Sequence, residues 1–236
     1  MSINYDLYNK STGKKPCPPG TARVKRCSLN LNPHSEDILS SNVFGHLKLL
    51  QPTLWVQKLL TRAYGERDFT HLDYSTFGIR FWDKAGTHPL KTGRPEFDFS
   101  LDVSPIKVIT ECKYRSCIRM EQLVQYLNLI AHLHYETLCQ DVYFLLITTD
   151  ESEPEVLSQF RDADILAKHI EQMRPHTDYK RLCINLSQNI GWISWAGILQ
   201  IIETILAADL HYSERQIIND LVCYLRYKLN SRTNDK

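Results

Sequence analysis

Two neighbouring segments in the middle of the chain have the hydrophobic pattern of β-strands. From Phe97 to Val103, apolar and polar residues alternate without a break, which is the period of a strand with two different faces. A second strand-forming run extends from Ile106 to Tyr114, after Ser104-Pro105. We expect the two strands to form an antiparallel hairpin centred on Ser104-Pro105. Proline fits poorly in the type I′ and II′ turns of two-residue hairpins, so a longer loop between the strands is an alternative.

The rest of the pattern predicts helices around a sheet. Helices are expected over residues 35–50, 54–64, 118–138, 153–173, 195–209 and 213–229, and further strands over 74–82, 141–149 and 181–186. The strand at 141–149 contains a continuous apolar run, as in a buried central strand. Ser213 to Gln216 should form a capping box at the start of the last helix. Together the elements predict an α/β (α+β) fold, with a mixed central β-sheet flanked by helices.

Length and composition suggest one globular domain with an N-terminal arm. The chain has 236 residues, of which 43% are hydrophobic and 23% charged, and this usage excludes a wholly disordered protein. Residues 1–33 are rich in proline and glycine and carry six basic and no acidic residues between Lys10 and Arg26. We expect them to form an irregular basic arm, either a solvated tail or a phosphate-contacting segment. Residues 34–236 should form a single α/β domain with C-terminal helices.

The sequence predicts a cytoplasmic protein that does not contact a membrane. No apolar run approaches the roughly 20 residues needed to span a bilayer, and Met1 to Lys10 lacks an apolar signal core. The seven cysteines are scattered and include no Cys-x-x-Cys pair, which favours reduced thiols. The net charge is +1, so any contact with nucleic acid must come from local basic clusters.

The predicted hairpin brings three charged side chains together. If Val103 faces Ile106, the same register places Asp98 opposite Glu111, with Cβ atoms about 4.5–5.5 Å apart. Glu111 and Lys113 are two residues apart and therefore share a strand face. Opposed carboxylates repel, and a divalent cation offsets this; Mg²⁺ typically takes one or two carboxylates plus water. The alternative is a solvated edge strand on which Lys113 simply pairs with one of the two carboxylates.

The helix expected from Ser35 carries a further acidic candidate. At about 100° per residue, Glu36 falls near the middle of the apolar face. A carboxylate turned toward the core is costly unless it is paired or bound to a metal; the alternative is a frayed first turn in which Glu36 only favours the helix dipole. Asp37 and Asn42 remain open as the helix-borne site residue. The apolar face consists of Leu39, Val43, Leu47 and Leu50.

The helix that follows the hairpin carries Gln122 and Tyr126, which are four residues apart and share a face. Both side chains can donate hydrogen bonds to a phosphate or hold a water molecule. The alternative is an ordinary half-exposed surface pair.

The order of these residues resembles the PD-(D/E)XK nuclease superfamily, which has the restriction-endonuclease-like fold. Its core has a helix with an acidic residue, a strand bearing Asp, a strand bearing Glu-x-Lys and a helix. The corresponding residues are Glu36, Asp98, Glu111-Cys112-Lys113, and the helix with Gln122 and Tyr126. The Gln-x-x-x-Tyr element is similar to that of the RecB-type exonuclease branch. The resemblance covers about residues 35–150, and Glu96-Phe97-Asp98 stands where the family has Pro-Asp.

This resemblance implies a Mg²⁺-dependent nuclease, with Mn²⁺ as a possible substitute, that hydrolyses phosphodiester bonds in DNA. It implies a role in antiviral defence, restriction or repair, as an endonuclease or an exonuclease. Asp98, Glu111, the backbone carbonyl of Cys112 and Glu36 would bind the metal. Lys113 would position the attacking water and stabilise developing charge, while Gln122 and Tyr126 would contact substrate or water. The implied partners are DNA and a second copy of the chain or a larger defence complex.

Two other functions remain open. The first is a catalytically inactive module on the same fold that binds nucleic acid or supports assembly. The second is an unrelated scaffold that docks partners through its C-terminal helices, where aromatic residues could form an interface, although core positions are the more common place for them. The aromatic residues concerned are Trp192, Trp195, Tyr224 and Tyr227. The side chain of Cys112 should point to the opposite strand face, into the core.

Overall fold

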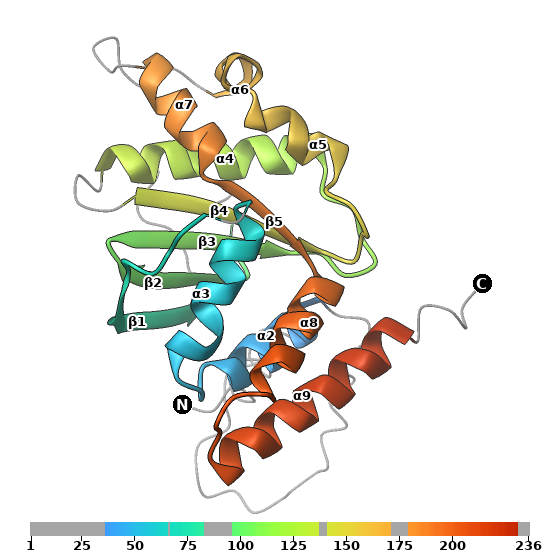
Figure 1. The fold of residues 1–236 in the computed structure, drawn as a ribbon. Helices are drawn as coiled ribbons and strands as arrows, with labels where there is room; N and C mark the ends of the chain where they lie inside the picture. Colours follow the sequence, from blue (N-terminus) through green and yellow to red (C-terminus); the bar gives the residue numbers. More distant parts are fainter. Residues whose placement is uncertain (1–35, 66, 83–95, 137–140, 171–178, 231–236) are drawn as a thin grey trace, which may run out of the picture.

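The computed structural model describes residues 36–65, 67–82, 96–136, 141–170 and 179–230. They form a five-stranded sheet in the order β1-β2-β3-β4-β5, with helices on both faces (Figure 1). This arrangement confirms the predicted α/β fold with a mixed sheet. The predicted basic arm, residues 1–33, lies outside the described part of the chain. No helix in the described part is long and apolar enough to cross a membrane.

The sheet contains both antiparallel and parallel pairs. The strands are β1 Asp73–Phe81, β2 Phe99–Ser104, β3 Ile106–Cys112, β4 Asp141–Thr148 and β5 Ile190–Ser194. The β1–β2 and β2–β3 pairs are antiparallel, whereas the β3–β4 and β4–β5 pairs are parallel. In the β2–β3 hairpin, Val103 pairs with Ile106 and Phe99 with Thr110, so the predicted register is confirmed. Extending it by one residue places Asp98, just before β2, opposite Glu111.

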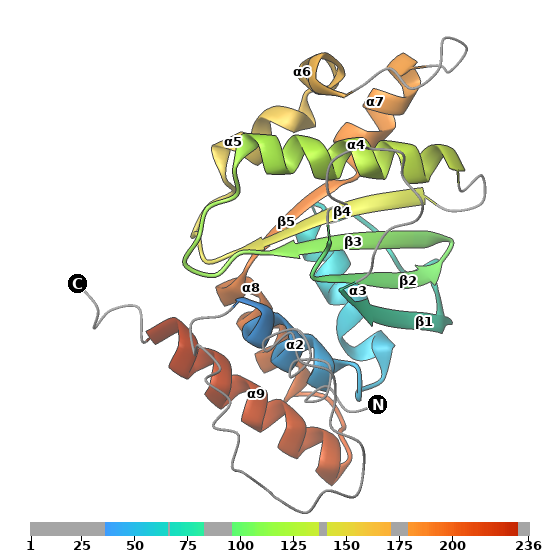
Figure 2. The ribbon, with the colours of Figure 1, turned by 180° about the vertical axis from the view of Figure 1, so that it is seen from behind.

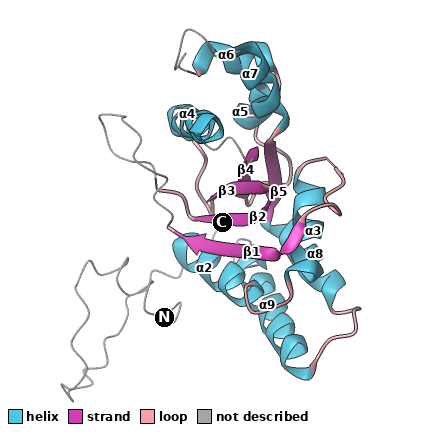
Figure 3. Ribbon diagram, turned by 90° about the vertical axis from the view of Figure 1, so that its left-hand side faces the viewer, coloured by secondary structure: helices cyan, strands magenta, loops and turns pink. Residues whose placement is uncertain are grey.

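Helices cover the two faces of the sheet separately, as the views from behind and from the side show (Figures 2 and 3). One face carries α4 Met120–Glu136, α5 Glu155–Ser158, the short 3₁₀ helix η1 Gln159–Arg161, α6 Ala163–His169 and α7 Tyr179–Gln188. The other face carries α2 Glu36–Leu47, α3 Pro52–Ala63, α8 Trp195–Ile205 and α9 Tyr212–Asn230. Each layer encloses its own hydrophobic cluster, one on either side of the sheet. The sheet therefore lies between two apolar layers, as expected of such a sandwich.

The single helix predicted over 153–173 is wrong, because the segment breaks into three short helices. Asp162 has an extended backbone, with φ −86° and ψ 117°, and it separates η1 from α6. Its side chain accepts hydrogen bonds from the backbone N–H groups of Asp164 and Ile165, so it acts as the N-cap of α6. The capping preference of this aspartate outweighs the helical periodicity of its surroundings.

The strand predicted over 181–186 is also wrong, because this segment belongs to helix α7. Cys183 and Leu186 are buried at a helical spacing of three residues. The fifth strand is Ile190–Ser194, which the sequence analysis did not identify. Short apolar runs do not distinguish a strand from a helix segment by periodicity alone, which explains the exchange.

The start of α9 differs slightly from the predicted capping box at Ser213. The side chain of Glu214 accepts a hydrogen bond from the backbone N–H of His211, at 3.0 Å. His211 directly precedes the helix. The capping contact from the fourth residue back to the first, expected between Gln216 and Ser213, is therefore made two residues earlier, between Glu214 and His211. In α2, by contrast, the predicted apolar stripe of Leu39, Val43 and Leu47 is buried, and Leu50 is buried just beyond the helix.

Candidate active site

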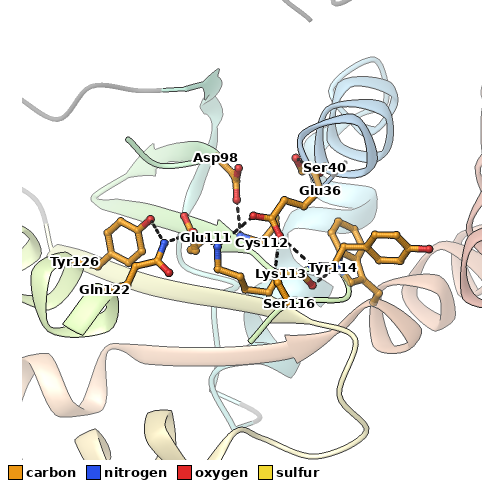
Figure 4. A network of polar contacts seen from close by, with 11 residues as sticks. Glu36, Ser40, Asp98, Glu111, Cys112, Lys113, Tyr114, Ser116, Gln122 and Tyr126 are labelled. Carbon is orange, nitrogen blue, oxygen red and sulfur yellow. Dashed lines mark hydrogen bonds and ion pairs between the residues drawn. The ribbon is translucent and has the colours of Figure 1, made fainter. Parts of the chain in front are cut away.

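The predicted site residues meet where β3 ends, between α2 on one face of the sheet and α4 on the other (Figure 4). Glu111 is near the end of β3, and Lys113 follows the strand directly. Asp98 precedes the neighbouring strand β2. All three are buried, with exposed fractions of 8% for Asp98, 4% for Glu111 and 6% for Lys113. The polar face is therefore not solvated, although Lys113 does pair with Glu111, as the alternative also expected.

Asp98 is bonded to the backbone of the strand opposite it. Its Oδ2 atom accepts a hydrogen bond from the backbone N–H of Cys112, at 2.6 Å. The carboxylate is thereby held against the residue that separates Glu111 from Lys113. The Cys112 thiol is itself fully buried in the cluster on the α2 side, which confirms the predicted core position, and burial raises its pKa.

Glu111 receives donors from both its own strand end and α4. Its Oε1 atom lies 2.6 Å from Nζ of Lys113, which confirms that the two side chains lie on the same side of the strand. The same oxygen accepts a hydrogen bond from Nε2 of Gln122, at 3.1 Å. Gln122 also donates to the hydroxyl of Tyr126, at 2.9 Å, so the predicted helix pair joins the site instead of forming a surface pair.

Glu36 completes the network from α2. Its Oε1 atom lies 3.2 Å from Nζ of Lys113, and its Oε2 atom accepts hydrogen bonds from the Tyr114 backbone N–H at 3.2 Å and from the Ser116 hydroxyl at 2.9 Å. Figure 4 shows Glu36 reaching down from α2 to Lys113. The carboxylate is therefore paired, as its position on the apolar face requires, and is not merely a first-turn charge.

The other two candidates on α2 behave differently. The side-chain amide of Asn42 donates to the hydroxyl of Tyr224 on α9, at 3.3 Å, and this contact takes it away from the carboxylates. The negative charge of Asp37 is close enough to Asp98 to help raise its pKa. Glu36 thus bonds directly to Lys113 in the site, whereas Asp37 acts on the site through the effect of its negative charge on the pKa of Asp98.

The pKa values of all three buried site groups are raised, but for different reasons. Burial, and then the negative charge of Glu111, raises the pKa of Asp98 well above its usual value. Burial also raises the pKa of Glu111, although the Lys113 ammonium partly counters it. Burial alone would lower the pKa of Lys113, but the carboxylates of Glu111 and Glu36 outweigh it, so the pKa is raised. The site therefore holds Lys113 protonated and has a deficit of positive charge around its carboxylates.

Two further residues support the site that the sequence analysis did not identify. The indole N–H of Trp195, fully buried at the start of α8, donates to the backbone carbonyl of Lys113 at 3.2 Å. Tyr114 binds Glu36 through its backbone N–H, and its hydroxyl donates to the backbone carbonyl of Lys228 in α9, at 2.9 Å. These bonds involve backbone atoms, which leave no signal in a pattern of residue types.

The aromatic residues considered for a docking interface are mostly engaged inside the protein. Trp195 is fully buried, and the half-buried Trp192 donates from its indole N–H to the hydroxyl of Thr148, at 3.0 Å. Tyr224 accepts from Asn42, whereas Tyr227 is 70% exposed. A broad aromatic docking face on the C-terminal helices is therefore not formed by this set.

The carboxylates of the site suit one class of metal ion and not another. Among the described residues, no group of three or more His, Cys, Asp or Glu side chains is arranged to hold a metal ion. Asp98 and Glu111 nevertheless provide two buried carboxylates, each with a raised pKa, and Cys112 provides a backbone carbonyl directly after Glu111 in the chain. This set fits Mg²⁺, which takes one or two carboxylates and completes its shell with water and substrate oxygens. It does not fit a fully protein-ligated metal such as structural zinc.

A comparison of the chain with models of known protein families, with curated proteins and with solved structures finds no match. The resemblance to the PD-(D/E)XK superfamily therefore stays a prediction, based on the order of residues and on the network in Figure 4.

Proposed function

We propose that the protein is a metal-dependent nuclease that hydrolyses phosphodiester bonds in DNA. The observation that carries the proposal is the contact between Lys113 and Glu111, whose side-chain atoms lie 2.6 Å apart in a buried site beside Asp98. Structural ion pairs usually balance their charges, and this network does not, since Glu36 and Glu111 share the ammonium of Lys113 and Asp98 adds a third carboxylate beside them. A carboxylate-rich, buried and partly compensated cluster with perturbed pKa values is typical of a functional site.

The proposal includes a divalent cation because the carboxylates outnumber the positive charges at the site. Asp98 and Glu111 would hold Mg²⁺ or Mn²⁺, together with the backbone carbonyl of Cys112. A cation held there would supply charge stabilisation for a phosphoryl oxygen and would lower the pKa of a bound water molecule. Glu36 lies farther along the network and holds Lys113 and the Tyr114 backbone, which makes it a positioning residue in this proposal.

The remaining side chains have roles that follow from their chemistry. Lys113 is held in its protonated form and can donate hydrogen bonds to the attacking water or to the negatively charged phosphoryl oxygens. Gln122 donates from Nε2 to both Glu111 and Tyr126, so it fixes the rotamer of Glu111, while its side-chain carbonyl can accept a hydrogen bond from substrate or water. Each of these roles needs the side chains to stay where the network places them.

The proposal also covers location and assembly. We place the enzyme in the cytoplasm, with foreign or damaged DNA as its substrate and a role in defence, restriction or repair. Cutting both strands of a duplex often takes two active sites, so a second copy of the chain or a larger defence complex is the proposed partner. Cleavage of linear but not circular DNA would identify an exonuclease, and cleavage of both an endonuclease.

A cleavage assay tests the function directly. Linear duplex, circular duplex and single-stranded DNA are incubated with the full-length protein in Mg²⁺, in Mn²⁺ and in EDTA. We expect cleavage with either metal, none in EDTA, and loss of cleavage in Lys113→Ala. Lys107→Ala is the matched control, because Lys107 is on β3, the strand that Lys113 follows, and also pairs with a carboxylate, that of Asp102, at 3.4 Å. Equal cleavage by the two variants would contradict the proposed role of Lys113.

The second candidate is an inactive module that binds nucleic acid or supports assembly on the same fold. It is favoured by one observation: Oε1 of Glu111 already accepts from both Lys113 and Gln122, as in a purely structural network. Salt-sensitive binding of DNA without turnover in either metal would identify this function. Cleavage that depends on Lys113 would exclude it.

A further inference from the structure

The backbone of Lys113 is held on both sides, although the residue lies just beyond the end of β3. Its N–H group donates to the carbonyl of Ile147 in β4, at 2.7 Å. Its carbonyl accepts from the indole N–H of Trp195 at the start of α8, at 3.2 Å. The first bond continues the β3–β4 ladder by one residue, whereas the second comes from a side chain. The second bond can therefore be removed by substitution without changing Lys113 or the sheet.

Trp195 is itself fixed where β5 leads directly into α8 (Figure 1). Its side chain is fully buried and packs against Phe44 of α2, with a distance of 6.1 Å between the ring centroids. The residue before it, Ser194, caps α8 by accepting from the backbone N–H of Gly197, at 2.9 Å. The indole therefore cannot turn away from the Lys113 carbonyl without disturbing the contacts around it.

The place of the Lys113 ammonium depends on where the backbone of this residue is held. A lysine has a long flexible stem, so Nζ stays 2.6 Å from Glu111 and 3.2 Å from Glu36 only while the base of that stem is fixed. A functional side chain has to be held within about 0.5 Å of its working position. The bond from Trp195 supplies such a support from a residue 82 positions away in the chain.

We propose that Trp195 is a positioning residue of the site, whose indole N–H holds the Lys113 backbone and thereby sets the distance between the Lys113 ammonium and Glu111. For catalysis this inference rests on the proposed nuclease function, in which the same ammonium contacts the attacking water or a phosphoryl oxygen. A misplacement of about 1 Å can cost a hundred-fold in rate. The bond from Trp195 should therefore matter more for turnover than for the binding of DNA.

Two variants weaken this support, and each has a matched control. Trp195→Phe removes the N–H donor and keeps an aromatic ring. Its control is Trp192→Phe, because Trp192 also donates from its indole, to the hydroxyl of Thr148 at 3.0 Å, three residues earlier in the chain. Ser194→Ala is a milder variant that removes the cap of α8 and loosens the turn that carries Trp195. Its control is Asp162→Ala, which removes the cap of α6 on the other face of the sheet.

The first measurement follows the ion pair without any cleavage. Urea unfolding of Lys113→Met, Glu111→Gln and the double variant gives the coupling energy between the two side chains, and this cycle is repeated in each background. We expect the coupling to fall by about half in Trp195→Phe, to fall less in Ser194→Ala and to be unchanged in both controls. A loss of packing alone lowers the stability of every member of a cycle equally and leaves the coupling as it was.

The second measurement is steady-state cleavage of duplex DNA in Mg²⁺, with kcat and KM determined separately. We expect Trp195→Phe to lower kcat roughly ten-fold or more while KM stays within about two-fold of the wild-type value. Trp192→Phe and Asp162→Ala should leave both constants near those of the wild type. A thermal melt of each variant confirms that it is folded at the assay temperature.

The outcomes separate this inference from the proposed function. If the wild type cleaves DNA but the coupling is unchanged in Trp195→Phe, the positioning role is wrong and the nuclease function stands. If the coupling falls while no metal supports cleavage, Trp195 positions Lys113 but the nuclease function is wrong. Equal falls in Trp195→Phe and Trp192→Phe would show a general loosening of the sheet and would overturn the positioning role. If Trp195→Phe does not fold, an unchanged coupling in Ser194→Ala overturns it.

Discussion

Nζ of Lys113 lies 3.2 Å from Oε1 of Glu36, although 77 positions separate the two residues in the chain. The contact joins α2, which packs on one face of the sheet, to the end of β3. The same ammonium lies 2.6 Å from Glu111, whose other donor, Gln122, comes from α4 on the opposite face. Lys113 is therefore the centre of a polar network that connects the two faces of the sheet at the end of β3.

Removing the charge of Lys113 should destabilise the fold as well as abolish cleavage. In Lys113→Met the carboxylates of Glu111 and Glu36 remain without their ammonium, and Glu111 remains buried. Breaking a buried pair in this way costs about 3–5 kcal/mol. Urea unfolding at neutral pH measures the loss. The double variant Lys113→Met/Glu111→Gln should recover part of it, and no recovery would show that packing rather than charge is responsible.

Asp98→Asn should stabilise the metal-free protein at neutral pH. The pKa of Asp98 is raised by burial and by Glu111, so the folded state binds its proton more tightly than the unfolded chain. The free energy of unfolding therefore falls as the pH rises from the pKa of the unfolded state, near 3.9, to the higher pKa of the folded state. The loss is up to about 1.4 kcal/mol for each unit by which the two pKa values differ. The asparagine keeps an acceptor for the Cys112 amide and avoids this loss.

The measurement for Asp98→Asn is the urea midpoint across a pH series in EDTA. The advantage of the variant should be present at neutral pH and should disappear in acid. Addition of Mg²⁺ should reverse the order, because a bound ion stabilises the wild type by about 2.7 kcal/mol at 100 times its dissociation constant. A variant that is less stable than the wild type at neutral pH in EDTA would contradict the charge repulsion inferred for this site.

Tyr126→Phe isolates the role of a single hydroxyl. The Tyr126 ring packs against Phe97 and Phe144, with centroid distances of 5.2 and 6.0 Å, and phenylalanine preserves these contacts. The variant loses the bond to Gln122, and it also loses the hydroxyl that lowers the pKa of Glu111. We expect a stability loss of about 1 kcal/mol.

For cleavage by Tyr126→Phe we expect a loss of roughly ten-fold, equivalent to about 1.4 kcal/mol. The acid limb of the pH–rate profile should shift to higher pH, because the pKa of Glu111 rises. An unchanged acid limb would exclude Glu111 as the group that titrates there.

Gly191→Ala should be strongly destabilising for a steric reason. A Cβ atom at Gly191 would overlap the ring of Tyr64, with the ring carbon Cζ at 2.6 Å. Tyr64 cannot move aside easily, because it is buried and its hydroxyl donates to the Phe144 carbonyl at 3.0 Å. We expect a loss of about 1–3 kcal/mol in thermal or urea unfolding. Gly78→Ala in β1 is the control, because a Cβ there has nothing within 4 Å, and it should cost much less.

Much of the site follows from sequence because strands impose simple rules. The hairpin register required only that Val103 and Ile106 pair, and it then placed Asp98 opposite Glu111. The period of two along a strand placed Glu111 and Lys113 together and sent Cys112 to the other side. Likewise, the position of Glu36 on an apolar helix face required a partner, which proved to be Lys113.

What the sequence left out depends on tertiary contacts of the backbone. The indole of Trp195 and the backbone N–H of Tyr114 contribute through bonds to the Lys113 carbonyl and to Glu36, which no spacing rule anticipates. The wrong strand prediction over residues 181–186, which belong to α7, also reflects tertiary context. A short apolar run forms a helix or a strand according to the elements that pack around it. The network itself is therefore more predictable than the supports that hold it.

The hydrogen bond from Tyr114 to the carbonyl of Lys228 has a consequence for any shortened form of this protein. The carbonyl belongs to the last turn of α9, so a chain that stops before that turn keeps every strand of the sheet yet loses the outer anchor of the residue beside Lys113. Deletion of this turn would thus loosen the position of Lys113, although the two are far apart in the sequence. Fusion tags at this end therefore belong beyond the helix.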